Sequence, residues 1–169
     1  GSIENVSILN SGNDALDFSG SKVNVKNILI NNAGDKGISV GEKSNITVEN
    51  IKLENTNIAL ASKDLSNLNL DNVEILNSNV AVAAYQKKPE YGPGFASITN
   101  ISIKDSKNKF IAVNNSKIKI NGEFVKGIQS YASLSWLQTK EDIINDGYYH
   151  YFNANGEKIV PGYTLDNIA

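Results

Sequence analysis

The sequence predicts an all-β fold: a right-handed parallel β-helix of about five rungs, closed at its C-terminal end by a helix and a β-hairpin. Three observations predict it. The phrase Asn–hydrophobic–any–hydrophobic recurs at nearly constant spacing, and short segments alternate between apolar and polar residues. Helical periodicity is absent from those segments, which favours strands stacked as the rungs of a solenoid.

The recurring phrase begins with Asn at positions 5, 27, 50, 72 and 100, so its intervals are 22, 23, 22 and 28 residues. A second polar column follows five residues later in every repeat, at Asn10, Asn32, Asn55, Asn77 and Asp105. Asn tolerates the left-handed backbone conformation, so we interpret both columns as corners of the rung rather than as ligand sites. Stacked amides can also form a hydrogen-bonded ladder from rung to rung.

Each predicted rung contains three short strands. The first segment covers residues 23–25, 46–48, 68–70 and 118–120, and the second directly follows the recurring Asn. The third comprises Leu16–Phe18, Ile38–Val40, Ile58–Leu60, Val80–Val82 and Ile111–Val113. Alternating β-branched residues indicate strands with one buried face. We therefore expect the triplets of each segment to align and to stack their apolar residues into columns.

Composition narrows the class of protein. Hydrophobic residues make up 40% of the 169 residues and the net charge is −2, which argues against nucleic acid as a partner. No apolar run approaches the roughly 20 residues that span a bilayer, so membrane insertion is not expected. The chain has no Cys and no Arg, which excludes thiol chemistry and bidentate guanidinium recognition of carboxylates.

Three regions are expected along the chain. Residues 1–2, Gly-Ser, are typical of the remnant of a cleaved expression tag. Residues 3–125 form the predicted β-helix, and residues 126–169 form a C-terminal capping segment. In that segment Thr139 is a candidate helix N-cap, and 148–152 with 158–160 are typical of a hairpin. The N-terminal rung has no matching cap, so we expect self-association through it.

Rung length and strand pattern over about residues 3–121 resemble those of the pectin-lyase-like superfamily of right-handed β-helices. More narrowly, the stretches 13–21, 34–44 and 61–64 resemble a β-helical segment of bacterial surface proteins, some of which carry a CotH-kinase-like domain. The resemblance implies an extracellular or cell-surface location in bacteria. It also implies a carbohydrate as the class of ligand.

The longest interval of the repeat carries an insertion, Tyr85–Phe95, in which two prolines and two glycines shape a loop with two tyrosines and two lysines. Binding sites of solenoids tend to lie at such insertions. With the flank beside it, the loop gives the following candidate ligand-binding residues: Asp17, Lys36, Ser39, Lys63, Asp64, Tyr85, Gln86, Lys87, Lys88, Glu90 and Tyr91. The opposing interpretations are a covering loop and a solvated face of mixed charge.

Two functions follow as hypotheses. The first is a non-catalytic module that binds carbohydrate or serves a structural role, without a cofactor. The alternative is a polysaccharide lyase acting on acidic glycans, in which Lys63 or Lys87 is the base and Asp17 and Asp64 hold Ca²⁺. Related lyases use Arg or Ca²⁺ at the substrate carboxylate, and the missing Arg counts against this alternative.

Overall fold

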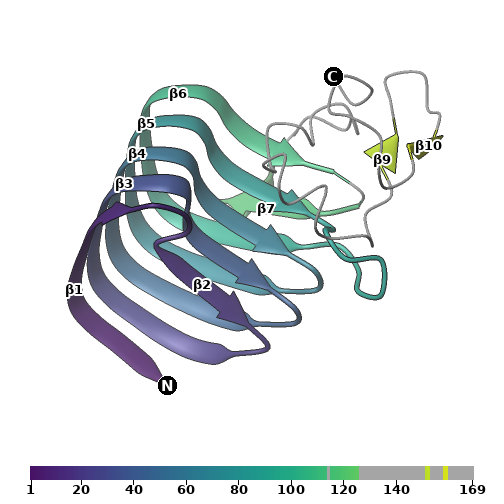
Figure 1. The fold of residues 1–169 in the computed structure, drawn as a ribbon, viewed down its shortest axis with the longest axis horizontal. Coiled ribbons are helices and arrows are strands. Elements are labelled where there is room, and N and C mark those ends of the chain that lie inside the picture. The colour runs from purple at the N-terminus through teal and green to yellow at the C-terminus, as the bar shows by residue number, and fades with distance from the viewer. Residues whose placement is uncertain (114, 126–150, 153–157, 160–169) are drawn as a thin grey trace.

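A computed structural model shows the chain as a parallel β-solenoid of about five turns (Figure 1). It describes residues 1–113, 115–125, 151–152 and 158–159. Followed from the N-terminus in Figure 1, the chain runs clockwise while successive turns recede from the viewer, which is the right-handed sense. The described residues form strands, turns and loops but no helix, and so no helix long and apolar enough to cross a membrane.

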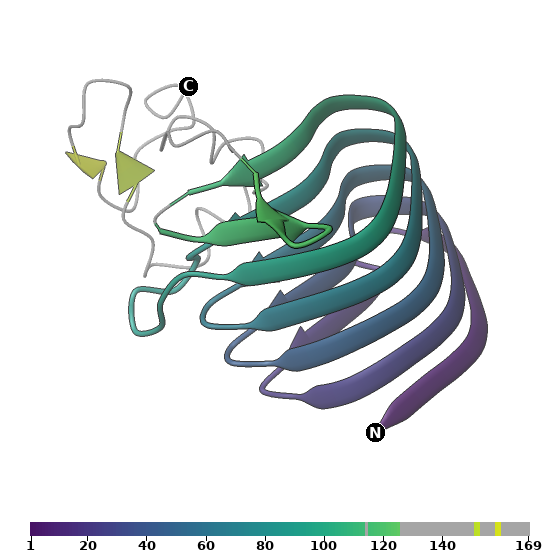
Figure 2. The same ribbon diagram turned by 180° about the vertical axis from the view of Figure 1, so that it is seen from behind.

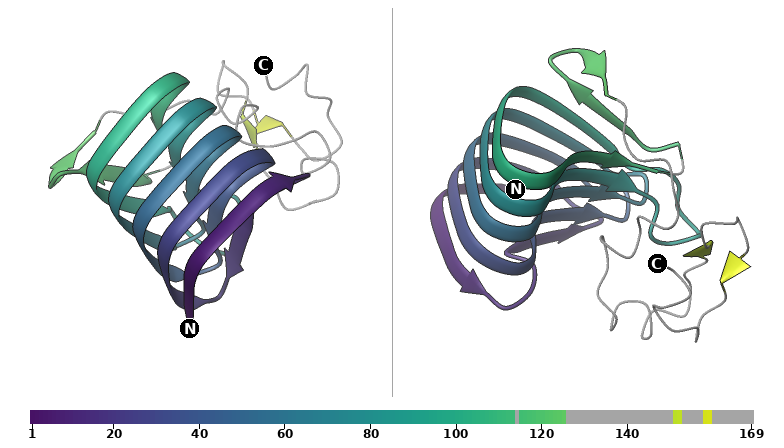
Figure 3. Two further views of the ribbon diagram at one scale, coloured as in Figure 1. Left: turned by 90° about the vertical axis from the view of Figure 1, so that its left-hand side faces the viewer. Right: turned by 90° about the horizontal axis from the view of Figure 1, so that it is seen from above.

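The strands are long because pairing continues around the corners of each turn. Their bounds are β1 Ser2–Ser11, β2 Leu16–Ser19, β3 Lys22–Gly41, β4 Asn45–Lys63, β5 Asn67–Tyr85, β6 Phe95–Ala112, β7 Lys117–Ile120, β8 Glu123–Phe124, β9 Tyr151–Phe152 and β10 Lys158–Ile159. In the main sheet the order is β1-β3-β4-β5-β6-β7-β8, with β2 paired to β3. Figure 3 shows the turns stacked side by side along one axis.

The two polar columns predicted from the repeat are corners. All ten of their residues have positive φ, from 54° at Asn55 to 64° at Asn32. The first column is also an amide ladder: Asn27 donates to Asn5 at 2.9 Å, Asn50 to Asn27 at 3.1 Å, and Asn72 to Asn50 at 2.8 Å. The corner prediction is therefore confirmed, and the ladder contributes hydrogen bonds between turns as well as backbone geometry.

The expected alignment of the third segments is wrong by two residues between the second and third turns and by three residues between the fourth and fifth turns. Ile38 pairs with Leu60, not Ile58, and Val82 pairs with Phe110, not Val113. Between the third and fourth turns the expected alignment is confirmed, since Leu60 pairs with Val82. Ile58 instead pairs with Lys36, and the register shifts by one residue between Ala33 and Lys36. The extra residue in β3 forms a bulge, which repeat spacing alone does not reveal.

The core consists of apolar columns inside the solenoid. Ile30, Leu53 and Ile75 occupy successive turns of one column and are fully buried. The outer face of the third segment is buried as well, since Ala61 and Ala83 are also 0% exposed. These two residues lie outside the main core cluster, so the third segment is covered on both faces.

The C-terminal cap was predicted as a helix followed by a hairpin. The helix lies outside the described residues. Strands β9 and β10 pair antiparallel, with Lys158 opposite Phe152 and Ile159 opposite Tyr151, as expected for the hairpin. Closure of the solenoid by this segment stays a prediction.

Candidate functional site

The candidate flank follows a tight turn that recurs at the end of the third segment. In one turn Glu42 and Lys43 have φ of 55° and 62°, and the Ser44 N–H donates to the Gly41 carbonyl at 3.2 Å. The next turn repeats this geometry at Lys63–Ser66. Two consecutive left-handed residues define a type I′ turn. Glu42 and Lys43 in one turn, and Asp64 and Leu65 in the next, therefore occupy left-handed backbone positions that fix the direction of their side chains.

The insertion replaces the third of these turns. Lys63 pairs with Tyr85 and Asn67 pairs with Phe95, so nine residues stand where the preceding turn has three, an excess of six. Gly94 permits the return, because a Cβ there would lie 2.1 Å from the carbonyl oxygen of Ser62. The loop therefore re-enters the solenoid against the backbone of the preceding turn.

The predicted ligand-binding residues divide by exposure. Five are buried and the remaining six are half-buried or exposed. The buried ones are Lys36, Ser39, Lys63, Asp64 and Tyr85; the others are Asp17, Gln86, Lys87, Lys88, Glu90 and Tyr91. Side chains of the buried group reach a ligand only if whatever covers them moves. Five of the eleven candidate residues therefore contact other protein groups rather than solvent in this structure.

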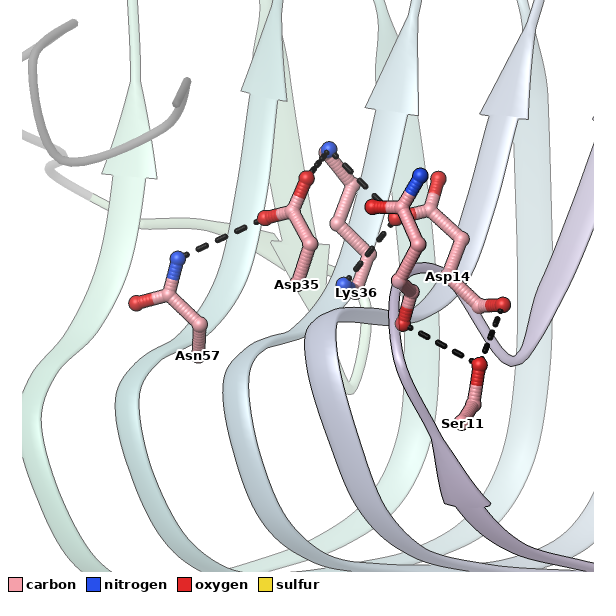
Figure 4. A network of polar contacts seen from close by, with 6 residues as sticks. Ser11, Asp14, Asp35, Lys36 and Asn57 are labelled. Carbon is pink, nitrogen blue, oxygen red and sulfur yellow. Dashed lines mark hydrogen bonds and ion pairs between the residues drawn. The ribbon is translucent and has the colours of Figure 1, made fainter. Parts of the chain in front are cut away.

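Lys36 belongs to a buried ion cluster on the outer side of the solenoid (Figure 4). Its ammonium lies 2.5 Å from a carboxylate oxygen of Asp35 and 3.6 Å from one of Asp14. Asn57 donates to Asp35 at 3.4 Å, and Asn79 donates to Asn57 at 2.7 Å. Burial raises the pKa of Asp14, with Lys36 opposing that shift. The cluster pairs its own charges across neighbouring turns.

Lys63 is 8% exposed, and its side chain lies across Gly41 of the preceding turn, where a Cβ would be 3.4 Å from its Cε. Among the described residues no carboxylate forms an ion pair with it. Burial, reinforced by the charges of Lys36 and Lys87, lowers the pKa of Lys63 to about 8. Lys63 is therefore partly neutral near physiological pH, which was not foreseen from the sequence.

Asp64 holds the inserted loop. One of its carboxylate oxygens accepts the backbone N–H groups of Lys87 and Lys88, both at 2.7 Å. Burial raises the pKa of Asp64, and these two hydrogen bonds oppose the shift. On the same turn the Leu65 N–H donates to the carbonyls of Gly92 and Pro93, at 3.2 and 3.1 Å.

The Gln86 side chain stabilises the loop by hydrogen bonds to its backbone. Its side-chain amide donates to the carbonyls of Lys88 at 3.1 Å, Pro89 at 3.4 Å and Tyr91 at 2.9 Å. The Lys88 ammonium bonds Glu42, which lowers the pKa of that carboxyl. Lys43 lies 5.7 Å from the centre of the Tyr91 ring, within cation–π range. Gln86, Lys88 and Tyr91 therefore contact the protein itself.

The acidic residues proposed for Ca²⁺ do not form a ligand set. Asp17 is exposed on the first turn, whereas Asp64 is 1% exposed two turns away and already accepts two backbone N–H groups. Within the described part of the chain, no three acidic or imidazole side chains are grouped closely enough to hold a metal ion. Calcium usually takes six to eight oxygen ligands, which these residues do not supply.

A groove that sequence reasoning missed runs along the first amide ladder. This shallow depression of about 530 Å³ crosses four turns and is lined by Asn5, Val6, Ser7, Asn27, Ile28, Leu29, Asn50, Ile51, Lys52, Asn72 and Glu74. Lys52 pairs with Glu54 at 2.8 Å beside it. The repeated Asn residues were the sequence feature that marks this groove. They were interpreted as turn residues alone, because a sequence does not show which corner of the turn forms a depression.

Fold and site together define the class: a parallel β-solenoid with amide-ladder corners and one internally bonded loop. Comparisons with protein-family models, with curated proteins and with solved structures give no match to this chain. The class therefore rests on the fold, and any activity rests on the residues described above.

Proposed function

We propose that this chain is a non-catalytic β-solenoid module of a bacterial extracellular or surface protein, with a structural role as a rigid spacer. The supporting observation is the bonding of the inserted loop. Asp64 and Gln86 carry five hydrogen bonds to loop backbone groups between them. These polar atoms already form hydrogen bonds with the loop backbone. This favours a loop that covers the solenoid over a loop that binds a ligand.

A glycan array tests this proposal. The unaltered chain is expected to retain no acidic or neutral glycan at physiological salt, and Lys87→Ala is expected to behave identically. Retention of a glycan that Lys87→Ala abolishes would overturn the structural role. The matched control is Lys26→Ala, which removes the same charge from an exposed position on the solenoid, 46% exposed at its side chain.

Carbohydrate binding is the second candidate, and the groove along the amide ladder favours it. Asn27, Asn50 and Asn72 present amides one turn apart, at about the 4.8 Å spacing of adjacent strands. Repeated amides, with Lys52 and Glu74 beside them, offer regularly spaced donors and acceptors to a sugar chain.

The groove is tested with the variant Lys52→Ala. Under carbohydrate binding, a glycan retained by the unaltered chain is lost with Lys52→Ala and kept with Lys26→Ala, because Lys26 does not line the groove. Equal retention by the two variants would exclude the groove as the binding site.

The lyase alternative draws support from Lys63 alone. An amine with pKa about 8 can accept the proton next to a uronate carboxylate near neutral pH. Against it, Lys63 is 8% exposed, and the chain has no Arg to bind the carboxylate. Incubation with acidic glycans, followed by the absorbance of unsaturated products, is expected to show no product. Product that disappears in Lys63→Ala and persists in Lys26→Ala would establish the lyase.

A further inference from the structure

We propose that the outer face of the first segment holds a small-molecule site for a flat ring that carries an anionic group. A hollow of about 340 Å³ lies there, lined by side chains of β5, β6, β7 and β8, and it shares no residue with the groove along the amide ladder. Its volume is in the range of small-molecule sites. Every residue that lines it belongs to the described part of the chain. This inference goes beyond the spacer role and does not depend on it.

Two columns of outward side chains form the floor of the hollow. Pairing aligns Asn67 with Phe95 and Lys117 in one column, and Asn69 with Ser97 and Lys119 in the other. The residue between the two columns is buried in each strand, as at Ile118, so both columns lie on the outer face. The amides of β5 therefore lie two turns from the ammonium groups of β7 on one surface.

Strand β8 places an aromatic ring beside these lysines. It pairs antiparallel with β7, and Phe124 stands opposite Lys119 (Figure 2). The two connecting residues, Asn121 and Gly122, have φ of 48° and 87°, which is typical of a type I′ hairpin turn. The ring centre of Phe124 lies 5.2 Å from the Lys117 ammonium and 4.8 Å from the Lys119 ammonium. The hairpin therefore fixes the ring and both cations relative to one another.

The Phe124 ring is left largely in solvent. It is 63% exposed, although a phenyl ring contributes most to stability when it is buried. Contact with two ammonium groups accounts for its position but leaves most of its surface open. A second flat ring stacks on such a surface at about 4.5–7 Å between ring centres. Phe95, which is half-buried in the floor of the hollow, offers a further apolar contact.

The hollow carries an uncompensated positive charge. None of the residues that line it is acidic. Neither Lys117 nor Lys119 forms an ion pair with a described residue, whereas Lys26, Lys52 and Lys88 each do. Lys117 and Lys119 lie two residues apart on one strand, about 6.6 Å between Cα atoms, and both ammonium groups approach the same ring, so their charges repel each other. An anion between them would remove this repulsion and accept charge-assisted hydrogen bonds from both.

The side-chain amides of Asn67 and Asn69 add polar contacts to the site. On the same strand the amides of Asn72, Asn77 and Asn79 donate to the preceding turn. Those of Asn67 and Asn69 line the hollow and form no hydrogen bond with another described residue. Each amide offers an NH₂ donor and an oxygen acceptor to substituents of a ring. Ring, anion and substituents thus each find a counterpart, which is the chemistry of an aryl phosphate or an aryl carboxylate.

Titration followed by backbone amide NMR tests the site in the unaltered chain. Phenyl phosphate is expected to shift the signals of residues 117–125. It is also expected to bind about tenfold more tightly than inorganic phosphate, which lacks the ring, or benzyl alcohol, which lacks the anion, because stacking on one aromatic ring has an effect of this size. Benzoate is expected to shift the same signals, and its affinity relative to phenyl phosphate tells which anion the lysines prefer.

Two variants locate the binding. Lys119→Gln removes one ammonium group, and Phe124→Leu removes the aromatic face but keeps an apolar side chain; each is expected to weaken binding of phenyl phosphate about tenfold. Lys104→Gln is the control, since it removes an exposed lysine of β6 that does not line the hollow, and it is expected to bind unchanged. The proposal is overturned if phenyl phosphate shifts no signals, or if Lys119→Gln and Lys104→Gln bind it equally. Inorganic phosphate or glucuronate binding as tightly as phenyl phosphate would also overturn it, in favour of a general anion site or an acidic-sugar site.

Discussion

The Asp64 carboxylate accepts a 2.7 Å hydrogen bond from the backbone N–H of Lys88, although 24 residues separate the two in the chain. The same oxygen accepts the Lys87 N–H. Asp64 lies in a type I′ turn at φ 53°, so the corner of one turn of the solenoid anchors the loop of the next. This bond joins the regular repeat to its single large interruption.

Asp64→Ala is therefore expected to destabilise the fold. It removes two charge-assisted hydrogen bonds and places Ala at a left-handed φ, with a total cost of about 3 kcal/mol in the free energy of unfolding. Urea unfolding measures this cost, and tryptic cleavage after Lys87 reports release of the loop, since the Lys88–Pro89 bond resists trypsin. Asp64→Asn is the control, because it keeps an acceptor oxygen and tolerates the same φ. Equal loss in both variants would contradict the anchoring role.

Lys63→Met is expected to stabilise the protein at pH 7. The pKa of Lys63 is lowered from 10.5 to about 8, so between these values the folded state binds fewer protons than the unfolded state. The free energy of unfolding therefore rises as pH increases from about 8 to 10.5. Below pH 8 the full cost of charging the buried Lys63 amine is present. The cost of charging Lys63 below pH 8 is about 3 kcal/mol, which the methionine removes.

The check is the free energy of urea unfolding measured from pH 7 to 10.5. The unaltered chain should show the rise and Lys63→Met should show a flatter profile. Lys26→Met serves as control, because this exposed lysine forms a surface ion pair with Glu49 that is worth at most about 1 kcal/mol. Parallel profiles for the unaltered chain and Lys63→Met would show that Lys63 is not the titrating group.

The solenoid could be predicted from the sequence because the same residue type, Asn, recurs at each corner of the turn. Asn27 and Asn50 occupy equivalent corners in structure as in sequence. Asp14 and Lys36 each lie two residues before the paired Leu16 and Ile38, and the Lys36 N–H donates to the Asp14 carboxylate. The register of the third segment was mispredicted because Ile58, rather than Leu60, was taken as the counterpart of Ile38, and a one-residue bulge lies before Lys36. Spacing between repeats does not tell where within a repeat the extra residue lies.

The candidate site was only partly predictable for a different reason. The position of the insertion in the sequence identified Lys63, Asp64 and Gln86 as polar residues near it. In the structure these residues do lie beside the inserted loop. Whether a polar side chain faces a ligand or the protein depends on neighbours from other turns. Gln86 bonds loop carbonyls, and Lys63 crosses Gly41. The Lys63–Gly41 contact joins residues 22 positions apart, and Gln86 bonds carbonyls two to five residues away in an irregular loop, so a local hydrophobic pattern reports neither contact.

Asn50→Ala is expected to cost about 3 kcal/mol in the free energy of unfolding, from two lost ladder hydrogen bonds and a strained left-handed φ. Asn50 donates to Asn27 at 3.1 Å and accepts from Asn72 at 2.8 Å. Asn50→Gly separates the two effects, because Gly adopts the same φ of 58° without strain. Urea unfolding should rank the unaltered chain above Asn50→Gly and Asn50→Gly above Asn50→Ala. Indistinguishable variants would mean that the corner geometry contributes little.

Gly37→Ala is expected to disrupt the bend into the third segment. A Cβ at Gly37 would lie 2.3 Å from Cδ2 of Leu53 and 2.6 Å from the carbonyl oxygen of Ala59, and the backbone oxygen cannot move aside without shifting the next turn. Overpacking of this kind costs about 1–3 kcal/mol, and the backbone contact puts Gly37→Ala at the upper end. Thermal unfolding measures the loss. Gly12→Ala is the matched control, because no described atom lies within 4 Å of its added Cβ. If both variants unfold alike, then Gly37 is not constrained by the approach of the neighbouring turn, and the tight bend must be maintained by other residues.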